Sequence, residues 1–355
     1  MKLQLTKLFY KLIILLLITT TGYSQKEFFR SQQAFTNDQM TGFASSITIN
    51  KELILFNAND YHLYAYNKNN GSLQWSYQTN FKSATPVFVQ DSIVYAGIYT
   101  DKKEQSAQFD LATGKFIKAL PFGPLKTKPF IKNGVLYSTA IHNYGCIIAY
   151  DLKKDTVMWS RFIAHGYSNQ PYYQQNKIMA NAEGSNWVAL GYDGVLLDTT
   201  CAVKPDFFVE GIPCVKTLAA ISHDGLEIKG KLSEKIFGNN FFERPDIITT
   251  KNLTVILYEN KLSILARKLK IKQQVLVDTL PGDEFTGNDI AKLIDADDEN
   301  TWLLYGDYLL QYNHSEKKVV SATNLTNWQP QAVLLEDKNI WLVSGKDGLL
   351  YGLSL

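Results

Sequence analysis

Residues 295–300 read Asp-Ala-Asp-Asp-Glu-Asn and resemble part of a calcium-binding loop. Calcium prefers carboxylate and amide oxygens, which this segment offers at close spacing. The segment lacks the glycine at the sixth position and the bidentate glutamate further along that such a loop needs. Because it separates the apolar residues Ile294 and Trp302, we predict a solvated hairpin turn here and no metal site.

The sequence has five histidines, His62, His142, His165, His223 and His314, and none pair at the spacing of zinc ligands. His62, His142 and His223 each follow the second strand of a repeated unit, which would place them on loops of one face. Loops are rich in polar side chains, so we interpret these three as turn residues, with a ligand-facing rim as the alternative. No Ser-His-Asp order, glycine-rich phosphate loop or His-Glu-x-x-His motif is present, so no catalytic residue is predicted.

A second polar set stands just before or within the first strand of each repeated unit and comprises Lys82, Lys126, Lys128, Gln170, Arg244, Asn288 and Gln329. If the first strands line a central channel, several of these side chains converge on one mouth of that channel. Such cations and amides suit an anion or a polar peptide. Together with His62 and His142 they form the candidate face for a ligand or partner, and a water-filled channel lining is the alternative.

The N-terminus has the three parts of a secretory signal peptide. Residues 1–11 carry three lysines, residues 12–18 form an apolar run, and residues 19–24 are small and polar apart from Tyr23. The run is much shorter than the ~20 residues that span a bilayer, and no cysteine follows it that could carry a lipid anchor. We predict cleavage near Ser24, export to the periplasm or the medium, and a mature chain of residues 25–355 without a transmembrane segment.

Export bears on the three cysteines. Cys201 and Cys214 lie 13 positions apart, and an oxidising compartment permits a disulfide between them. Two buried thiols are the alternative, because the sequence does not give the distance between the two Cα atoms. Cys146 stands in an apolar stretch and is expected in the core.

The composition restricts the class of protein. Residues 1–24 hold three of the 36 basic residues and none of the 34 acidic ones, so the remainder carries a net charge of −1. Such a chain has no general attraction to nucleic acid. Hydrophobic residues make up 45% and charged residues 20%, which excludes a disordered chain, and 13% aromatics favour β-sheet.

Two patterns recur along the chain. One is a strand, a polar turn and a second strand, first seen in residues 63–77 around Asn70-Gly71, where Asn-Gly suits a tight hairpin. It returns in residues 107–117 and 148–159, with weaker copies at 310–320 and 349–355. The other pattern is a proline at the start of a short strand. The first residue of a strand need not donate a backbone hydrogen bond to its neighbour, so proline is tolerated there.

The spacing of these patterns predicts the fold. The units start at 44, 86, 129, 171, 213, 245, 289 and 330, and the fifth is the shortest. Four short strands repeated every ~40–45 residues are the signature of a β-propeller. We therefore predict a single all-β propeller domain of four-stranded blades over residues 25–355, with eight blades, or seven as the alternative.

The unit Ala65-Tyr-Asn67-Lys-Asn-Asn-Gly71-Ser-Leu-Gln-Trp75 resembles the PQQ-like propeller repeat of quinoprotein dehydrogenases, whose pattern is Ala-x-Asp-x-x-Thr-Gly-x-x-x-Trp. The copy that ends at Trp159 has Asp155 in the glycine position, and the copy with Thr113-Gly114 has Lys118 in the tryptophan position. The resemblance implies that Trp75 and Trp159 dock between neighbouring blades. It also implies either a quinone enzyme with calcium or a non-enzymatic, BamB-like propeller.

The sequence disfavours the quinone enzyme. Such an enzyme needs a calcium site of carboxylate and amide oxygens with an Asp base, and members of that class resemble one another in a disulfide between adjacent cysteines. Here the cysteines are never adjacent, and the docking tryptophan survives in only two units. We therefore expect no cofactor and a non-catalytic, exported protein that binds or scaffolds another macromolecule. A degenerate quinoprotein enzyme that uses the channel mouth is the alternative.

The two ends of the chain are expected to meet. The last unit supplies only three strands, in residues 332–335, 339–343 and 349–355, which would leave an unpaired apolar edge. Residues 27–35 precede the first unit and have no other partner. We predict that residues near 26–35 form the outermost strand of the last blade.

Overall fold

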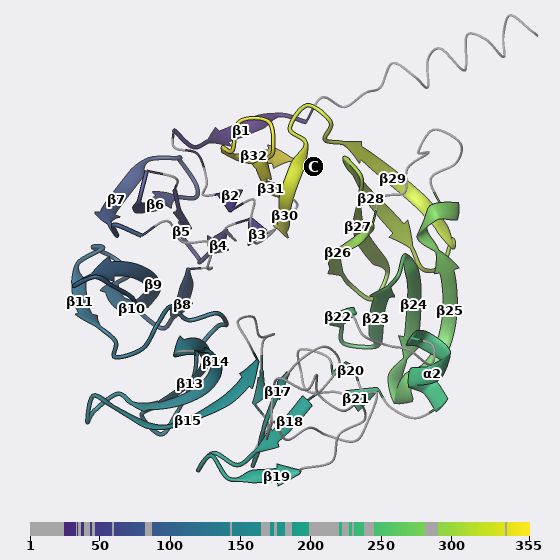
Figure 1. Cartoon of the computed structure of the whole chain (residues 1–355). Coiled ribbons are helices and arrows are strands. Elements are labelled where there is room, and N and C mark those ends of the chain that lie inside the picture. The colour runs from purple at the N-terminus through teal and green to yellow at the C-terminus, as the bar shows by residue number, and fades with distance from the viewer. Residues whose placement is uncertain are drawn as a thin grey trace, which may run out of the picture.

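The computed structural model describes residues 25–355 apart from 33, 35–36, 39–42, 45–46, 59, 82–86, 143, 165–170, 174–175, 182–186, 199–219, 222–226, 229–230, 238–244, 281–289 and 338. The described residues form seven four-stranded antiparallel sheets, here called blades 1 to 7, and two two-stranded sheets. Figure 1 shows the blades arranged around a central axis, with strands such as β4, β8 and β30 nearest to it. The protein is therefore an all-β propeller, as the repeat predicts.

The strands of blades 1 to 4 follow one another along the chain, from the innermost outward in each blade. Blade 1 consists of β4 (Thr48–Ile49), β5 (Leu53–Asn57), β6 (His62–Asn67) and β7 (Leu73–Gln78). Blade 2 consists of β8 (Phe88–Gln90), β9 (Ile93–Thr100), β10 (Lys103–Asp110) and β11 (Phe116–Ala119). Blade 3 consists of β12 (Phe130–Lys132), β13 (Val135–His142), β14 (Tyr144–Asp151) and β15 (Thr156–Ala164). Blade 4 consists of β16 (Tyr172–Tyr173), β17 (Ile178–Asn181), β18 (Trp187–Leu190) and β19 (Leu196–Asp198).

The other three four-stranded sheets are blades 5 to 7. Blade 5 consists of β22 (Asp246–Thr249), β23 (Leu253–Tyr258), β24 (Lys261–Ala266) and β25 (Lys270–Leu276). Blade 6 consists of β26 (Lys292–Ala296), β27 (Asn300–Tyr305), β28 (Tyr308–Asn313) and β29 (Lys318–Asn324). Blade 7 consists of β30 (Pro330–Glu336), β31 (Asn339–Ser344), β32 (Leu350–Ser354) and β1 (Glu27–Arg30). The remaining elements are β2 (Asn37–Asp38), β3 (Phe43–Ala44), β20 (Ala220–Ile221), β21 (Glu227–Ile228), α2 (Lys231–Phe237), η1 (Arg267–Leu269) and η2 (Val277–Thr279).

The turn between the third and fourth strands explains the repeated Asx residue. In blade 2 the Asp110 carboxylate accepts hydrogen bonds from the backbone N–H and the hydroxyl of Thr113, at 2.9 and 2.6 Å. Gly114 lies four residues after Asp110, and its N–H donates to the Asp110 carbonyl at 2.9 Å. We call the position of Gly114 the turn position. Its left-handed φ of +66° favours glycine. The equivalent turns begin at Asn67, Asp151 and Asn313.

The prediction of eight blades is wrong for the described residues. The unit expected to start at Pro213 contributes only β20, β21 and α2 to the described structure. Its described residues form no four-stranded sheet. In addition, Leu232 and Ile236 of α2 stand four residues apart with the charged Glu234 between them, where strand alternation would require an apolar residue.

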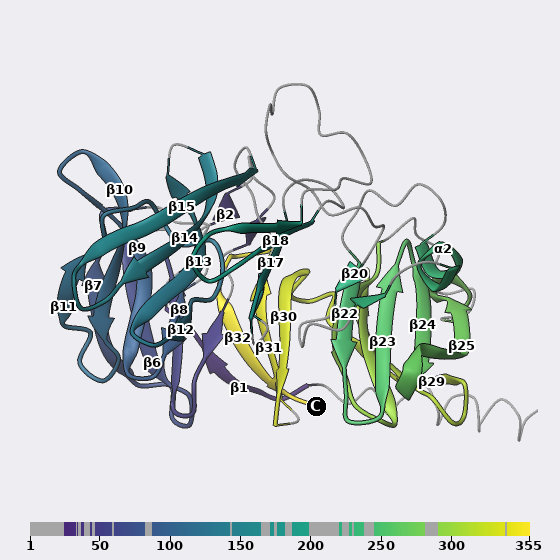
Figure 2. The same ribbon diagram turned by 90° about the horizontal axis from the view of Figure 1, so that it is seen from below.

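The helix α2 explains how this sector holds together. Each blade face needs an apolar partner, and shared core clusters join blades 1–2, 2–3, 3–4, 5–6, 6–7 and 7–1. Among the described residues no such cluster joins blades 4 and 5. Instead, Ile236 and Phe237 of α2 pack with Ile256 and Leu265 on that face of blade 5. Figure 2 shows α2 beside β24 and β25. The helix therefore covers a face that a neighbouring blade covers elsewhere.

The N-terminal segment lies where the sequence predicts. Strand β1 pairs antiparallel with β32, with Phe29 opposite Gly352 and Arg30 opposite Tyr351. The Ser31 N–H donates to the Leu350 carbonyl at 2.9 Å. The fourth strand of blade 7 thus comes from the opposite end of the chain, at the edge of β32 (Figure 1).

In blades 1 and 3, one residue of the outermost strand, at what we call the docking position, contacts the next blade. It pairs with the third strand directly before a register shift, as Trp75 does opposite Ala65 and Trp159 opposite Ala149. The Trp75 indole N–H donates to the Leu111 carbonyl of blade 2 at 2.9 Å, and the Trp159 indole to Tyr192 of blade 4 at 3.1 Å. Both tryptophans therefore dock against the next blade, as the resemblance implies.

An aromatic docking residue goes with a glycine in the next blade. A Cβ added at Gly114 would lie 2.5 Å from the Trp75 ring, and one at Gly194 would lie 2.7 Å from the Trp159 ring. Phe29, the docking residue of blade 7, lies 3.2 Å from the corresponding point at Gly71. At Gly114 and Gly194 a Cβ would clash with the ring, so glycine is required there for steric reasons as well as for its φ.

The two departures from the repeat pattern form a pair. Lys118 occupies the docking position of blade 2 and Asp155 the turn position of blade 3. The Lys118 amine lies 2.6 Å from the Asp155 carboxylate and donates to the Tyr150 hydroxyl at 3.1 Å. At this interface the docking residue is polar and the turn residue has a side chain. The Lys118–Asp155 ion pair therefore occupies the place that a tryptophan ring packed on glycine occupies between blades 1 and 2 and between blades 3 and 4.

Candidate functional site

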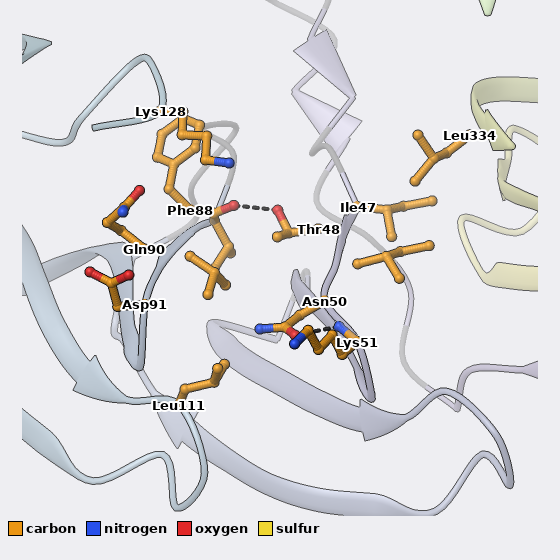
Figure 3. A pocket seen from close by; sticks show the side chains of 13 residues that line it. Ile47, Thr48, Asn50, Lys51, Phe88, Gln90, Asp91, Leu111, Lys128 and Leu334 are labelled. Carbon is orange, nitrogen blue, oxygen red and sulfur yellow. Dashed lines mark hydrogen bonds between the residues drawn. The ribbon is translucent and has the colours of Figure 1, made fainter. Parts of the chain in front are cut away.

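A cavity of about 850 Å³ lies in the central channel between the innermost strands of blades 1 and 2 (Figure 3). Its walls come from β4 and β8 and the turns after them, with Leu111, Lys128 and Leu334 completing the lining. Figure 3 places Lys128 and Leu334 on opposite sides of the cavity. Residues of four blades, on or next to their innermost strands, therefore lie around one space, whose volume is within the size range of ligand pockets.

The lining of the channel cavity mixes apolar, polar and charged side chains. Phe88 and Leu334 supply apolar surface, and Lys51, Asp91 and Lys128 supply charges of both signs. The Thr48 hydroxyl donates to the Val87 carbonyl and ties β4 to the segment before β8. The cavity thus offers hydrogen bonds and charge along an apolar wall, which suits a polar, partly apolar ligand such as a peptide segment.

Three members of the predicted polar set are described, and they do not all meet. Lys128 lines the channel cavity. Lys126 is half-buried, its N–H donates to the Thr139 carbonyl at 2.8 Å, and burial lowers the pKa of its amine. Gln329 is exposed, with a left-handed φ of +48°. Other members of the set lie outside the described residues, namely Lys82, Gln170, Arg244 and Asn288.

The histidines of the candidate face lie at one end of their blades. His62 begins β6, and its Nδ1 lies 2.9 Å from the Asp60 carbonyl, so it is part of the turn between the second and third strands. His142 ends β13 at the corresponding turn of blade 3. His165 and His223 lie outside the described residues. The expectation that His62 and His142 occupy turns at one face thus agrees with where the strands place them.

The remaining sequence candidates are mostly structural. Residues 297–299 form the turn between β26 and β27, as predicted, and the Asp297 carboxylate accepts the N–H of Asn300 at 2.6 Å. Cys146 is buried in the cluster between blades 2 and 3, and burial raises the pKa of its thiol. The proposed bridge between Cys201 and Cys214 falls outside the described residues.

Within the described ranges, no three His, Cys, Asp or Glu side chains gather in a way that could hold a metal ion. In the same ranges, no helix is long and apolar enough to cross a membrane.

Sequence reasoning missed most of the channel cavity. The predicted residues stand just before or within the innermost strands, whereas Asn50, Lys51, Gln90 and Asp91 line the cavity from the far ends of β4 and β8. Their signal was present, because each pair is the polar turn that follows a first strand. Deciding which end of each strand borders a cavity requires the tilt of the blades, which the repeat does not give.

Comparison with known proteins adds a family to this architecture. Residues 32–182 match the family described as outer membrane protein assembly factor BamB. No curated protein sequence matches the chain at a significant level. Among solved structures, the computationally designed Ika8 protein is similar over 93% of this chain and 100% of its own, with a TM-score of 0.57 and 12% identity.

BamB from Moraxella catarrhalis is also similar, over 88% of this chain and 82% of its own, with a TM-score of 0.46 and 11% identity. At 12% identity, the likeness to the designed Ika8 protein speaks for the fold alone. The family match, the Asx-capped turns and the tryptophans docked on glycine agree on the kind of repeat. Over residues 32–182 the chain is therefore similar to the PQQ-like β-propeller repeat proteins.

Proposed function

We propose that this protein is an exported, non-catalytic propeller that binds or scaffolds another macromolecule through the mouth of its channel. The observation that carries the proposal is the channel cavity of about 850 Å³, whose lining comes from four different blades. A segment of a partner that enters it would contact apolar wall, amides and both signs of charge at once. The family matched by residues 32–182 is named for an assembly factor, which supports a binding role.

Export is the second part of the proposal. It rests on residues 1–24, with three lysines followed by an apolar run of seven residues and a small, polar end. The near-neutral remainder of the chain supports a protein partner rather than a nucleic acid.

We expect the purified protein not to bind pyrroloquinoline quinone in the presence of calcium. A quinone site needs a calcium cluster of carboxylate and amide oxygens, and no adjacent cysteines are available for the disulfide of such enzymes. Titration of the quinone with calcium, followed by quenching of tryptophan fluorescence, measures binding directly. A stoichiometric complex in the micromolar range would overturn the non-catalytic assignment.

A further inference from the structure

The interface between blades 5 and 6 lacks the aromatic ring that fills the equivalent space between blades 1 and 2, between blades 3 and 4, and between blades 7 and 1. Its docking position is Gln273, which pairs with Ile264 directly before the register shift of β25. Its turn position is Lys317, whose N–H donates to the Asn313 carbonyl at 2.9 Å and whose φ is +56°. The Gln273 amide donates to the Tyr312 hydroxyl. As between blades 2 and 3, a polar docking residue meets a turn residue that has a side chain.

Unlike Lys118 and Asp155, the residues Gln273 and Lys317 leave a hollow between their blades. A cavity of about 560 Å³ opens between the two blades, on the side of the turns. Leu253 and Ile264, both buried, form its apolar part, and Gln273, Asn313 and His314 line it with polar groups. Where blades 1 and 2 meet, Trp75 lies opposite Ala65 in the corresponding place. The space is therefore related by the repeat to one that accepts an indole.

The rim of this interblade pocket carries two charges of each sign. Lys272 and Lys317 are exposed cations, and Asp298 and Glu299 are the anions. The Asp298 carboxylate accepts hydrogen bonds from the Thr250 hydroxyl and from the Asn252 side chain, so it is held in place and its pKa is lowered.

His314 adds no charge of its own at neutral pH. Its Nδ1 lies 3.2 Å from the Asp298 carbonyl and its Nε2 lies 2.8 Å from the Thr301 hydroxyl. With Nδ1 as the donor, Nε2 accepts from the hydroxyl, and burial lowers the pKa of the ring. The ring is therefore neutral, and the pocket presents balanced cations and anions above an apolar floor.

We infer that the interblade pocket binds a free aromatic amino acid. The planar ring would lie against Leu253 and Ile264, near the space that an indole occupies between blades 1 and 2. The carboxylate would meet Lys272 or Lys317, and the ammonium group would meet Glu299. A ligand that is not tethered to β25 can shift outward past the Cβ of Lys317, which a tryptophan at position 273 cannot do. This site is separate from the channel cavity and does not depend on the proposed function.

Isothermal titration calorimetry of the mature protein with L-tryptophan tests the inference. We expect one site with a Kd of about 1 mM or tighter, in keeping with a ligand of this size. N-acetyl-L-tryptophanamide keeps the ring but lacks both charges, and it should bind at least about tenfold more weakly. Equal affinity for the two probes would overturn the inference, because the charges of the rim would then play no part. No saturable binding of L-tryptophan would overturn it as well.

Variants locate the site. The double change Gln273→Trp with Lys317→Gly would place an indole of the protein itself against a glycine, as Trp75 lies against Gly114. It should therefore abolish binding of L-tryptophan, and it should raise the melting temperature by about 2 °C or more. Leu276→Trp adds an indole to the exposed end of the same strand and should leave the affinity unchanged. Lys272→Gln and Glu299→Gln, both exposed, should each weaken L-tryptophan several-fold without unfolding the protein. Unchanged affinity in the double variant and in both single variants would contradict the site.

Discussion

A chain that begins at Thr41 is expected to aggregate or to melt far below the mature protein. It lacks β1, and with it Phe29, which is 4% exposed and packs edge-on against Tyr66 of blade 1 and Trp341 of blade 7. Truncating one buried Phe costs about 3–5 kcal/mol, and here a whole strand is lost. The edge of β32 would also be left without a partner, which favours association with other chains.

Size-exclusion chromatography and thermal unfolding of the purified chains measure this effect. The mature protein, which begins at Gln25, keeps β1 and the hydrogen bond from the Ser354 N–H to the Lys26 carbonyl, and it is the reference. A chain that ends at Gly348 lacks β32 and should fail in the same way as the one that begins at Thr41. If the Thr41 chain is monomeric and melts like the mature protein, β1 does not complete blade 7.

Replacement of Trp75 by alanine should lower the free energy of unfolding by about 3–5 kcal/mol, as for other buried aromatic residues. The side chain is 8% exposed, its N–H donates to the Leu111 carbonyl at 2.9 Å, and its ring lies directly on Gly114. The change would therefore open a cavity between two blades and leave a backbone carbonyl without its donor.

Chemical denaturation of the Trp75→Ala variant measures the loss. Leu73→Ala is the matched control, because Leu73 lies on the same strand but is 50% exposed, and surface changes usually stay within about 0.5 kcal/mol. A melting temperature of Trp75→Ala within about one degree of wild type would show that Trp75 does not dock the blades.

The repeat made the regular part of this fold predictable. Asn67 and Gly71 mark a turn whose hydrogen bonds any copy of the pattern can form, and Trp75 marks the docking position at a fixed distance from that turn. The role of β1 followed from counting strands, because three strands in the last unit require a fourth. Such features depend on local geometry and on alternation, which the sequence carries directly.

Other features depended on which residues meet across blades. Lys118 and Asp155 were each visible as departures from the pattern, but their ion pair follows only from the offset between a docking position and the next blade's turn. The short fifth unit could not be assigned, because proline spacing alone does not distinguish a compressed blade from a helix such as α2. The channel cavity depends on the tilt of β4 and β8, which no single residue encodes.

Site-specific photo-crosslinking in the organism that makes the protein tests the central claim most directly. A photoreactive phenylalanine at Leu334 places the reactive group on β30 in the channel cavity, where the leucine is 37% exposed. The same group at Met158, which is 53% exposed on the outermost strand of blade 3, is the control. If a macromolecule occupies the channel mouth, position 334 gives one discrete protein adduct that position 158 does not give. No adduct at position 334, or the same adducts at both positions, would contradict a scaffold that works through its channel.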